Sequence, residues 1–327
     1  MDMLERIGLE HPVVQAGMGG GVAGGELAGA VSAAGALGTV GMMAPQPYAA
    51  ALQRAHQLAP GRPVAANLLV PFIRRAHIDA SIAGGAALVV FHVGFPTRWI
   101  GALREARIPV FATVGTAAQA RRALDDGADG LVVQGVEAGG HLVGVEPLAV
   151  ALARVLDVAD GAPLFAAGGV AGAEDVRRLR DQGATAAVAG TRFLLTDESQ
   201  AHPDYKQRVL DAERTLQTML FGVGWPLLHR VVPNAATDRW CARSDLGPGW
   251  VRAVGRLSGP LGRALPLGAL GTMISLQRPA VPLFSPAVPL VGMPGNAVDR
   301  SALYAGDTIH RIHDIVPATE AVALLAR

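Results

Sequence analysis

Short apolar runs recur along the first two hundred residues, and each is bounded by glycine or polar residues. Runs rich in Val, Leu and Ala with no polar alternation are typical of strands that are buried on both faces, as in parallel sheets. Helical patterns lie between them, which favours an α/β protein. We expect strands at Val13–Gln15, Leu37–Val40, Val64–Leu68, Leu88–His92, Val110–Thr113, Leu131–Gln134, Leu164–Ala167 and Ala186–Ala189.

The predicted helices carry recognisable start and stop signals. Thr116 is a capping residue, and Ala117, Ala120 and Leu124 then share one helix face. A second helix is predicted from Ala173 to Arg180, with Val176 and Leu179 inward. Glycine favours the left-handed conformation that closes a helix before the chain turns back to a sheet. Such helix-to-strand turns are predicted at Gly35-Ala36, Gly85-Ala86, Gly127-Ala128 and Gly183-Ala184.

Eight strands with intervening helices match a (β/α)₈ TIM barrel in number, order and spacing. The chain of 327 residues exceeds the about 250 residues typical of that barrel, so we also expect an insertion. Near Thr196 the pattern changes, with frequent Pro, Gly and Arg, and Leu216 to Leu220 resembles a short helix. We therefore predict the main part of the barrel at 1–195, a lid at 196–292, and a returning segment at 293–327 with a helix near Pro317–Leu325.

A doubly wound sheet is the main alternative fold. The segment Gly19–Gly24 matches a dinucleotide-binding glycine pattern directly after a predicted strand. That pattern also requires an acidic residue about 20 positions later, and the chain has none between Glu26 and Asp79. The barrel interpretation is therefore preferred.

The composition of the chain limits the kinds of partner and the compartment that we expect for it. Lys+Arg 28 and Asp+Glu 27 nearly cancel, which argues against nucleic acid binding. The uncharged stretch from Leu27 to Gln53 is broken by glycines and prolines, so no membrane span is expected. The start of the chain lacks the order of a secretory signal, and the single Cys241 fits a reducing compartment, so we expect a cytoplasmic protein. The sequence is silent on oligomeric state, and a homodimer stays open.

Two glycine corners predict anion binding. Gly168-Gly169 and Gly190-Thr191 follow the seventh and eighth strands, where barrel enzymes bind phosphate with loop amides. Glycines that merely permit tight turns are the structural alternative. His141 follows Gly139-Gly140 just beyond the sixth strand, so we predict that it acts as a base or a donor to an anion.

Other polar residues end predicted strands. Gln134 can both donate and accept, as the edge of a heteroaromatic ring requires, although an amide that fixes a loop is equally consistent. Asn67 and His92 close strands where the pattern predicts burial, so each must find partners in a loop or in a ligand. His310 and His313 have metal-like spacing without a third ligand, and we expect no metal.

These residues together resemble the nitronate monooxygenase family, also called 2-nitropropane dioxygenases, which are FMN-dependent barrel enzymes. Gly17 stands at a position where that family usually has proline. The motifs that carry the resemblance are Gln15-Ala16-Gly17-Met18, Asn67, Phe91-His92-Val93-Gly94-Phe95-Pro96, the segment Gln134–His141, Ala167-Gly168-Gly169, Gly190-Thr191-Arg192-Phe193 and Tyr304-Ala305-Gly306.

The resemblance implies a set of roles. The cofactor FMN would contact Ala16, Gly17, Met18, Asn67, Gln134, Gly139 and Gly140, with its phosphate at Gly168, Gly169, Gly190 and Thr191. His141 would be the catalytic histidine, and His92 and Tyr304 would border the substrate. The implied reaction is oxidation of a small carbon acid such as an alkyl nitronate by molecular oxygen. The alternative is an FMN-dependent NAD(P)H reductase acting on an enoyl thioester or a quinone.

Overall fold

The computed structural model describes residues 3–264 and 273–327. These residues form two compact units. Unit 1 comprises the chain up to Glu137, then Val143–Ser199 and Ile315–Arg327. Unit 2 comprises Ala138–Leu142 and Gln200–Asp314, so the predicted returning segment is divided between the units.

Unit 1 contains an eight-stranded parallel sheet in the order β1-β9-β8-β6-β5-β4-β3-β2. A parallel bridge between Val14 and Leu37 joins the first and last strands of this order, so the sheet closes on itself. This confirms the predicted TIM barrel and excludes the doubly wound alternative. The strands are β1 (Val13–Gln15), β2 (Gly38–Val40), β3 (Val64–Leu69), β4 (Leu88–His92), β5 (Val110–Val114), β6 (Gly130–Gln134), β8 (Leu164–Ala167) and β9 (Ala186–Ala189).

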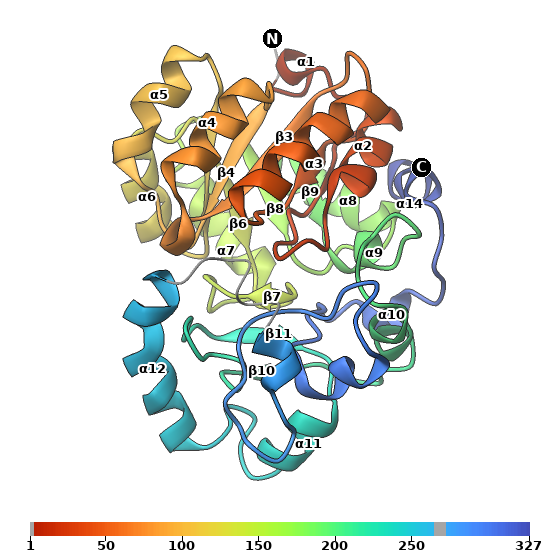
Figure 1. Ribbon diagram of the computed structural model, residues 1–327. Helices are drawn as coiled ribbons and strands as arrows, with labels where there is room; N and C mark the ends of the chain where they lie inside the picture. Colours follow the sequence, from red (N-terminus) through yellow and green to blue (C-terminus); the bar gives the residue numbers. More distant parts are fainter. Residues whose placement is uncertain (1–2, 265–272) are drawn as a thin grey trace. The chain divides into compact units, whose positions relative to one another are not determined.

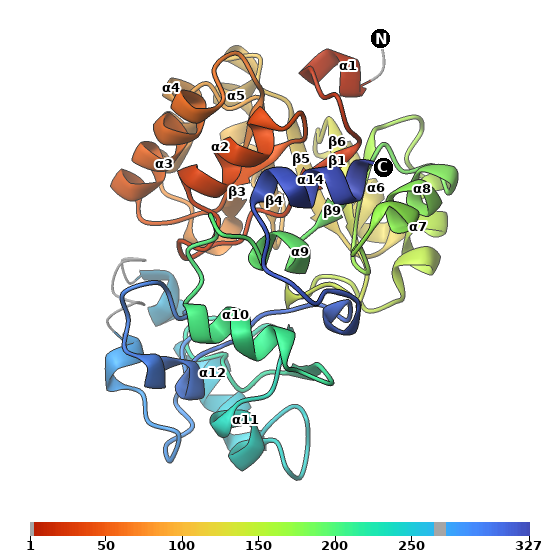
Figure 2. The same ribbon diagram turned by 90° about the vertical axis from the view of Figure 1, so that its right-hand side faces the viewer.

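Helices surround the strands of unit 1, as Figures 1 and 2 show. The predicted C-terminal helix is confirmed as α14, which contacts α2 and α8. The helices are α1 (Met3–Ile7), α2 (Gly25–Ala33), α3 (Pro45–Leu58), α4 (Arg75–Ala83), α5 (Ile100–Glu105), α6 (Ala117–Asp125), α7 (Leu148–Leu156), α8 (Ala173–Asp181), α9 (Thr191–Leu194) and α14 (Ala318–Ala326), with the 3₁₀ turns η1 (Val70–Phe72) and η2 (Thr97–Trp99).

Side chains alternate between two buried layers of unit 1. In β6, Leu131 and Val133 pack in the cluster under the helices, whereas Val132 packs in the barrel interior. In β8, Phe165 is likewise interior and lies 4.8 Å from Phe111 between ring centroids. Both layers exclude water, which explains why these strands are apolar without alternation.

The predicted helix signals are confirmed. The Thr116 hydroxyl accepts a hydrogen bond from the backbone N–H of Gln119 at 3.2 Å and so caps α6. The four glycines of the helix-to-strand turns all have positive φ, from 66° at Gly85 to 99° at Gly127. Residues with a Cβ are disfavoured there, so these glycines set where each helix ends.

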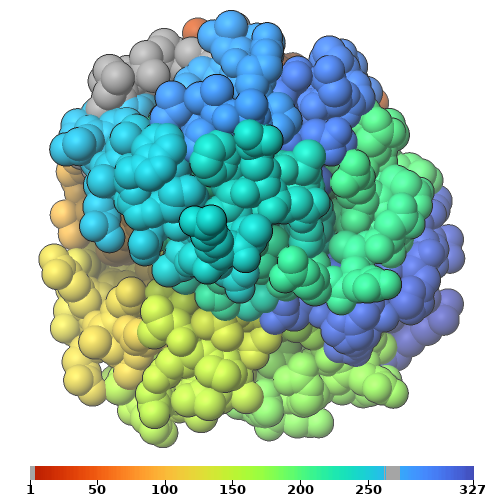
Figure 3. All heavy atoms as spheres, turned by 90° about the horizontal axis from the view of Figure 1, so that it is seen from below, coloured from red at the N-terminus to blue at the C-terminus, as the bar shows by residue number. Residues whose placement is uncertain are grey.

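Unit 2 is built around a small antiparallel sheet in the order β10-β11-β7. Its elements are β7 (Gly140–His141), β10 (Leu216–Thr218), β11 (His229–Val231), α10 (Pro203–Leu210), α11 (Ala235–Trp240), α12 (Gly249–Ala264), η3 (Gly295–Arg300) and η4 (Ile309–Arg311). Figure 3 shows one face of this unit, where its segments from green to blue form a continuous packed surface.

The prediction of a helix at Leu216–Leu220 is wrong. Leu216 and Thr218 are buried and Gln217 is half-buried, which is the alternation of a strand. This strand pairs with β11 in the register Leu216 to Val231 and Thr218 to His229. A pairing partner more than ten residues away therefore decided the conformation, and the local sequence does not reveal it.

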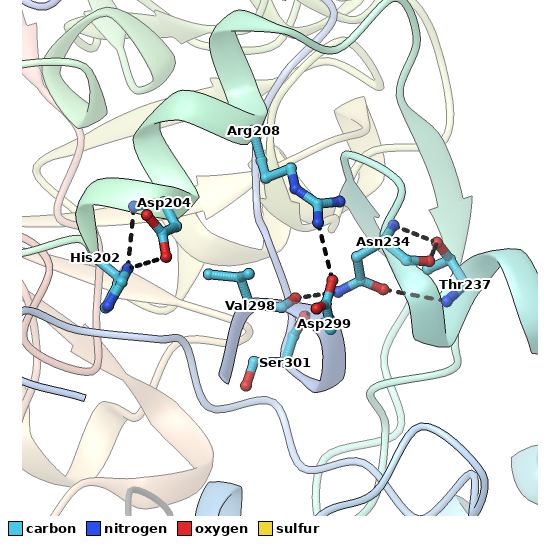
Figure 4. Close-up of polar contacts among 8 residues, drawn as sticks. All are labelled: His202, Asp204, Arg208, Asn234, Thr237, Val298, Asp299 and Ser301. Atoms are coloured by element: carbon cyan, nitrogen blue, oxygen red, sulfur yellow. Dashed lines mark hydrogen bonds and ion pairs between the residues drawn. The ribbon is translucent and has the colours of Figure 1, made fainter. Parts of the chain in front are cut away.

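A buried polar junction ties distant segments of unit 2 together (Figure 4). Asn234 caps α11 by accepting a hydrogen bond from the Thr237 N–H at 3.1 Å. Its amide nitrogen donates to the carbonyl oxygens of Val298 and Ser301 at 2.7 and 2.8 Å. Nearby, Arg208 pairs with Asp299 at 3.0 Å. One side chain thus holds η3 against the start of α11.

Among the described residues, no helix combines the length and the apolar character that crossing a membrane requires.

We predict that Asn234→Ala lowers the free energy of unfolding of unit 2 by about 2–4 kcal/mol, because a cap and two buried hydrogen bonds are lost. Asn234→Ser keeps a capping oxygen but lacks the amide donors, so it should lose only part of that stability. Urea unfolding followed by tryptophan fluorescence measures this, since Trp225, Trp240 and Trp250 all lie in unit 2. A serine variant as stable as the parent would show that the two carbonyl contacts contribute nothing.

Candidate functional site

Three polar side chains lie on the interior face of the barrel at the carboxyl ends of strands. Asn67, His92 and Gln134 each follow an interior residue, Ala65, Val90 and Val132 respectively, by two positions. Because side chains alternate along a strand, all three point to the same interior space. Asn67 and Gln134 are buried and His92 is half-buried. The structure thus brings together these three predicted site residues.

The turn after His92 is strained. Val93 has φ of 62°, a conformation that a β-branched residue rarely adopts, and Gly94 follows with φ of 113°. Strain of this kind is held in place by surrounding structure and is concentrated at functional sites. It occurs within the motif Phe91–Pro96 that carried part of the family resemblance.

Asn67 fixes the loop after β1. Its amide nitrogen donates to the carbonyl oxygen of Gly17 at 2.9 Å. A Cβ atom at position 17 would lie 2.2 Å from the Cβ of Asn67 and 2.9 Å from the Thr39 methyl carbon. Real Cβ atoms do not approach so closely, and a proline would bring the same Cβ. This contact explains why the chain has glycine where proline is usual.

Gln134 also serves its local loop. Its side-chain oxygen accepts a hydrogen bond from the Val143 N–H at 2.8 Å, where the chain re-enters unit 1. Glu137 binds the backbone N–H of Leu148, the first residue of α7, at 3.0 Å. This glutamate of the segment Gln134–His141 therefore anchors the start of α7. Sequence reasoning assigned it no role.

The two glycine corners lie at neighbouring strand exits, since β8 pairs with β9 in the register Ala167 to Val188. Gly168 and Gly169 have φ of 130° and 69°. A Cβ at Gly169 would meet only the Cβ of Glu137, at 4.0 Å, and one at Gly190 only that of Ala16, at 3.7 Å. The missing side chains leave open space beside the backbone, which is the arrangement that lets amides approach an anion.

A second group of predicted residues lies in unit 2. Gly139 is glycine because a Cβ there would lie 2.6 Å from the carbonyl carbon of Ala305. Gly140 has φ of 79° and pairs with Arg230, which places His141 opposite His229 across β7 and β11. The structure therefore brings His141 together with the Tyr304-Ala305 segment.

Aromatic rings surround His141, which is 8% exposed. The Trp225 indole stacks on its imidazole with 3.7 Å between centroids and 22° between planes. Tyr304 and His229 each lie at 5.2 Å. An imidazole packed on its face by an indole keeps its ring edge for hydrogen bonding. Sequence analysis missed Trp225 and His229, because both lie in the irregular segment and no periodic pattern marks them.

Burial shifts the pKa values of other ionisable groups in unit 2. Burial raises the pKa of Tyr304 well above its usual value, and its hydroxyl donates to the Pro286 carbonyl at 3.0 Å. Burial lowers the pKa of His229 to about 4. Burial also raises the pKa of Cys241, which disfavours the nucleophilic thiolate. Within residues 3–264 and 273–327, no group of three or more His, Cys, Asp or Glu side chains is arranged to hold a metal.

Comparison with known proteins identifies the family of the chain. The family model described as nitronate monooxygenase matches residues 2–81 and 72–224. The chain therefore belongs to the nitronate monooxygenase family.

Two curated relatives carry different printed activities. A (3aS,4S,5R,7aS)-5-hydroxy-7a-methyl-1-oxo-octahydro-1H-indene-4-carboxyl-CoA dehydrogenase from Mycobacterium tuberculosis is 34% identical over 215 residues, covering 64% of this chain and 60% of that protein. A nitronate monooxygenase from Pseudomonas aeruginosa is 36% identical over 142 residues, covering 41% of this chain and 40% of its own length. The chain thus spans less than two thirds of the length of these relatives.

The match to one solved structure covers nearly the whole of both chains. A nitroalkane oxidase from Streptomyces ansochromogenes matches with a TM-score of 0.76 and 27% identity, covering 99% of this chain and 96% of that one. This agreement includes both units of the chain, each of which has a counterpart there.

We predict that protonation of His229 destabilises the fold in acid. Because its folded pKa is about 4 and an unfolded histidine titrates near 6.5, the unfolded state binds more protons between these values. Stability should be fully present above pH 6.5 and be lost as the pH falls toward 4, by on the order of 2 kcal/mol between pH 7 and pH 5. Urea unfolding at both pH values measures this loss. In His229→Gln the loss should be smaller by about that amount, and an equal loss would contradict the assignment.

Proposed function

We propose that the protein is an FMN-dependent oxidoreductase that oxidises a small carbon acid, such as an alkyl nitronate, with molecular oxygen. The observation that carries the proposal is the buried His141, held in the family motif and packed against Trp225 and Tyr304. Apolar aromatic walls suit a small carbon acid, and the imidazole provides a proton acceptor beside them.

The residues of unit 1 fit a flavin mononucleotide. The open space at Gly169 and Gly190 is where backbone amides would hold its phosphate, together with the buried Thr191. Asn67 and Gln134 each use part of their side-chain amide for a hydrogen bond to a neighbouring loop. Ala16, Gly17 and Met18 would line the rest of the flavin site, and His92 would border the substrate. FMN would supply the electron acceptor that passes electrons to oxygen.

His141 would remove the proton from the carbon next to the nitro group of a neutral nitroalkane. For a substrate that is already a nitronate anion, its ring N–H would instead stabilise the negative oxygen atoms. Tyr304 would contribute its ring and not its hydroxyl, because that hydroxyl donates to Pro286. Trp225 would keep the imidazole in one orientation through stacking.

A second candidate is an FMN-dependent reductase or dehydrogenase of acyl thioesters. The relative from Mycobacterium tuberculosis, whose printed name is a carboxyl-CoA dehydrogenase, aligns over more of this chain than the nitronate monooxygenase from Pseudomonas aeruginosa does. A thioester also acidifies its neighbouring carbon, so His141 would again act as the proton acceptor.

Anaerobic mixing of the purified protein separates the two candidates. A yellow protein with absorption between about 300 and 500 nm is expected, since flavins absorb there. Rapid bleaching by a nitronate, without NAD(P)H, supports the first function. Bleaching by NADH or NADPH with no response to nitronates supports the second. A colourless protein that binds no added FMN contradicts both.

We predict that His141→Ala keeps its flavin and loses about 10²–10⁴ in turnover of a neutral nitroalkane, because the proton acceptor is gone. Turnover of the corresponding preformed nitronate should fall much less. Steady-state oxygen consumption with both substrate forms measures the difference. His11→Ala, in a loop of unit 1, is the matched control and should change neither rate. Equal losses with both forms would show that His141 stabilises charge and does not abstract the proton.

A further inference from the structure

His229 is the second imidazole of unit 2, and its tautomer is defined by its contacts. The ring is fully buried, with 0% of its surface exposed. Its Nδ1 lies 2.9 Å from the carbonyl oxygen of Leu227. A carbonyl oxygen only accepts, so Nδ1 carries the hydrogen. In the neutral ring, Nε2 then has a lone pair and acts only as an acceptor.

That acceptor has no protein donor. Within the part of the chain that the structure describes, Nε2 of His229 is buried without a hydrogen-bond partner. Leaving a buried acceptor unmatched costs about 1–3 kcal/mol, and buried polar atoms in native proteins are nearly always paired. The low pKa of the ring keeps it neutral near pH 7, so the lone pair stays available. An atom of this kind calls for a donor from outside the chain.

The position of His229 connects this acceptor to the predicted chemistry. The residue lies directly opposite His141 in the pairing of β7 with β11. Their ring centroids are 5.2 Å apart, and the Tyr304 ring meets His229 edge-on at 5.7 Å and 87°. Phe221 lies at 5.9 Å. The unmatched acceptor therefore belongs to the same aromatic cluster as the histidine proposed to act on the substrate.

We propose that His229 is a specificity-determining residue whose Nε2 accepts a hydrogen bond from a hydroxyl or N–H group of the substrate. The substrate is then a carbon acid that also carries a hydrogen-bond donor close to its acidic carbon, and a plain nitroalkane is a poor one. This inference rests on the proposed role of His141. His229 itself neither gives nor takes a proton in the reaction.

The kinetic test compares nitroethane with 2-nitroethanol, which differ by one hydroxyl group. The parent protein should show a kcat/KM for 2-nitroethanol at least tenfold above that for nitroethane, after correction for their rates of deprotonation in water. His229→Phe, which fills the site without an acceptor, should lower kcat/KM for 2-nitroethanol at least tenfold more than that for nitroethane and so abolish the preference. His229→Gln, which offers an amide oxygen, should restore part of it. Equal losses for both substrates in the phenylalanine variant would indicate a structural role and overturn the proposal.

A binding measurement keeps the proposal separate from the proposed function. In protein labelled with ¹⁵N-histidine, the bare Nε2 of His229 gives a signal that His229→Phe removes, and this signal should move upfield when 2-nitroethanol is added without oxygen. Nitroethane should leave it in place. Turnover without this shift overturns the role of His229. The shift without turnover of either compound supports His229 and overturns the proposed function.

Discussion

Closure of the parallel sheet is the constraint on which unit 1 depends. Backbone hydrogen bonds from Gln15 to Leu37 and from Leu37 to Val13, both 2.9 Å, join the first strand to the second and complete the ring. Once the ring is closed, each strand has one face toward the barrel interior and one toward the helices. The carboxyl ends of all eight strands then share one rim. Residues as distant in sequence as Asn67 and Gly190 are brought to that rim by closure alone.

Side chains at this rim combine a structural role with a proposed functional role. Asn67 and Gln134 each form a side-chain hydrogen bond to a neighbouring loop. This bond satisfies part of the buried amide and fixes its orientation. An amide held in this way keeps its other groups in a defined direction. The alternatives of a loop-fixing residue and a ligand-binding residue are therefore compatible, because the first prepares the second.

Most of unit 1 was predictable from sequence, because its strands are short, apolar and separated by helices with clear caps. Four of the strand ends shifted by one residue, and the four glycine turns and the Thr116 cap are as expected. Unit 2 was not predictable in the same way. Its strands β10, β11 and β7 are short and pair across long stretches of chain, so no local periodicity marks them. Trp225 and His229 can be recognised as candidate site residues only when that pairing is known.

The candidate site was likewise predictable from sequence only in part. Sequence motifs pointed to His141 and to the glycine corners, since glycine is required where backbone must approach closely or adopt positive φ. They could not reveal that Gly139 makes room for Ala305, or that Glu137 anchors α7. Such contacts join residues that share no local pattern, and only three-dimensional packing defines them.

The discontinuity of unit 2 has a consequence for biosynthesis. Its strand β7 is made early, but the partner strand β11 leaves the ribosome only after all eight barrel strands have been synthesised. Until then the segment around His141 has no neighbour with which to pair, and α14, which packs on the barrel, is made later than β11. Unit 2 is therefore complete only when Asp314 has been made, and unit 1 only when α14 has followed it, so both units finish late in translation.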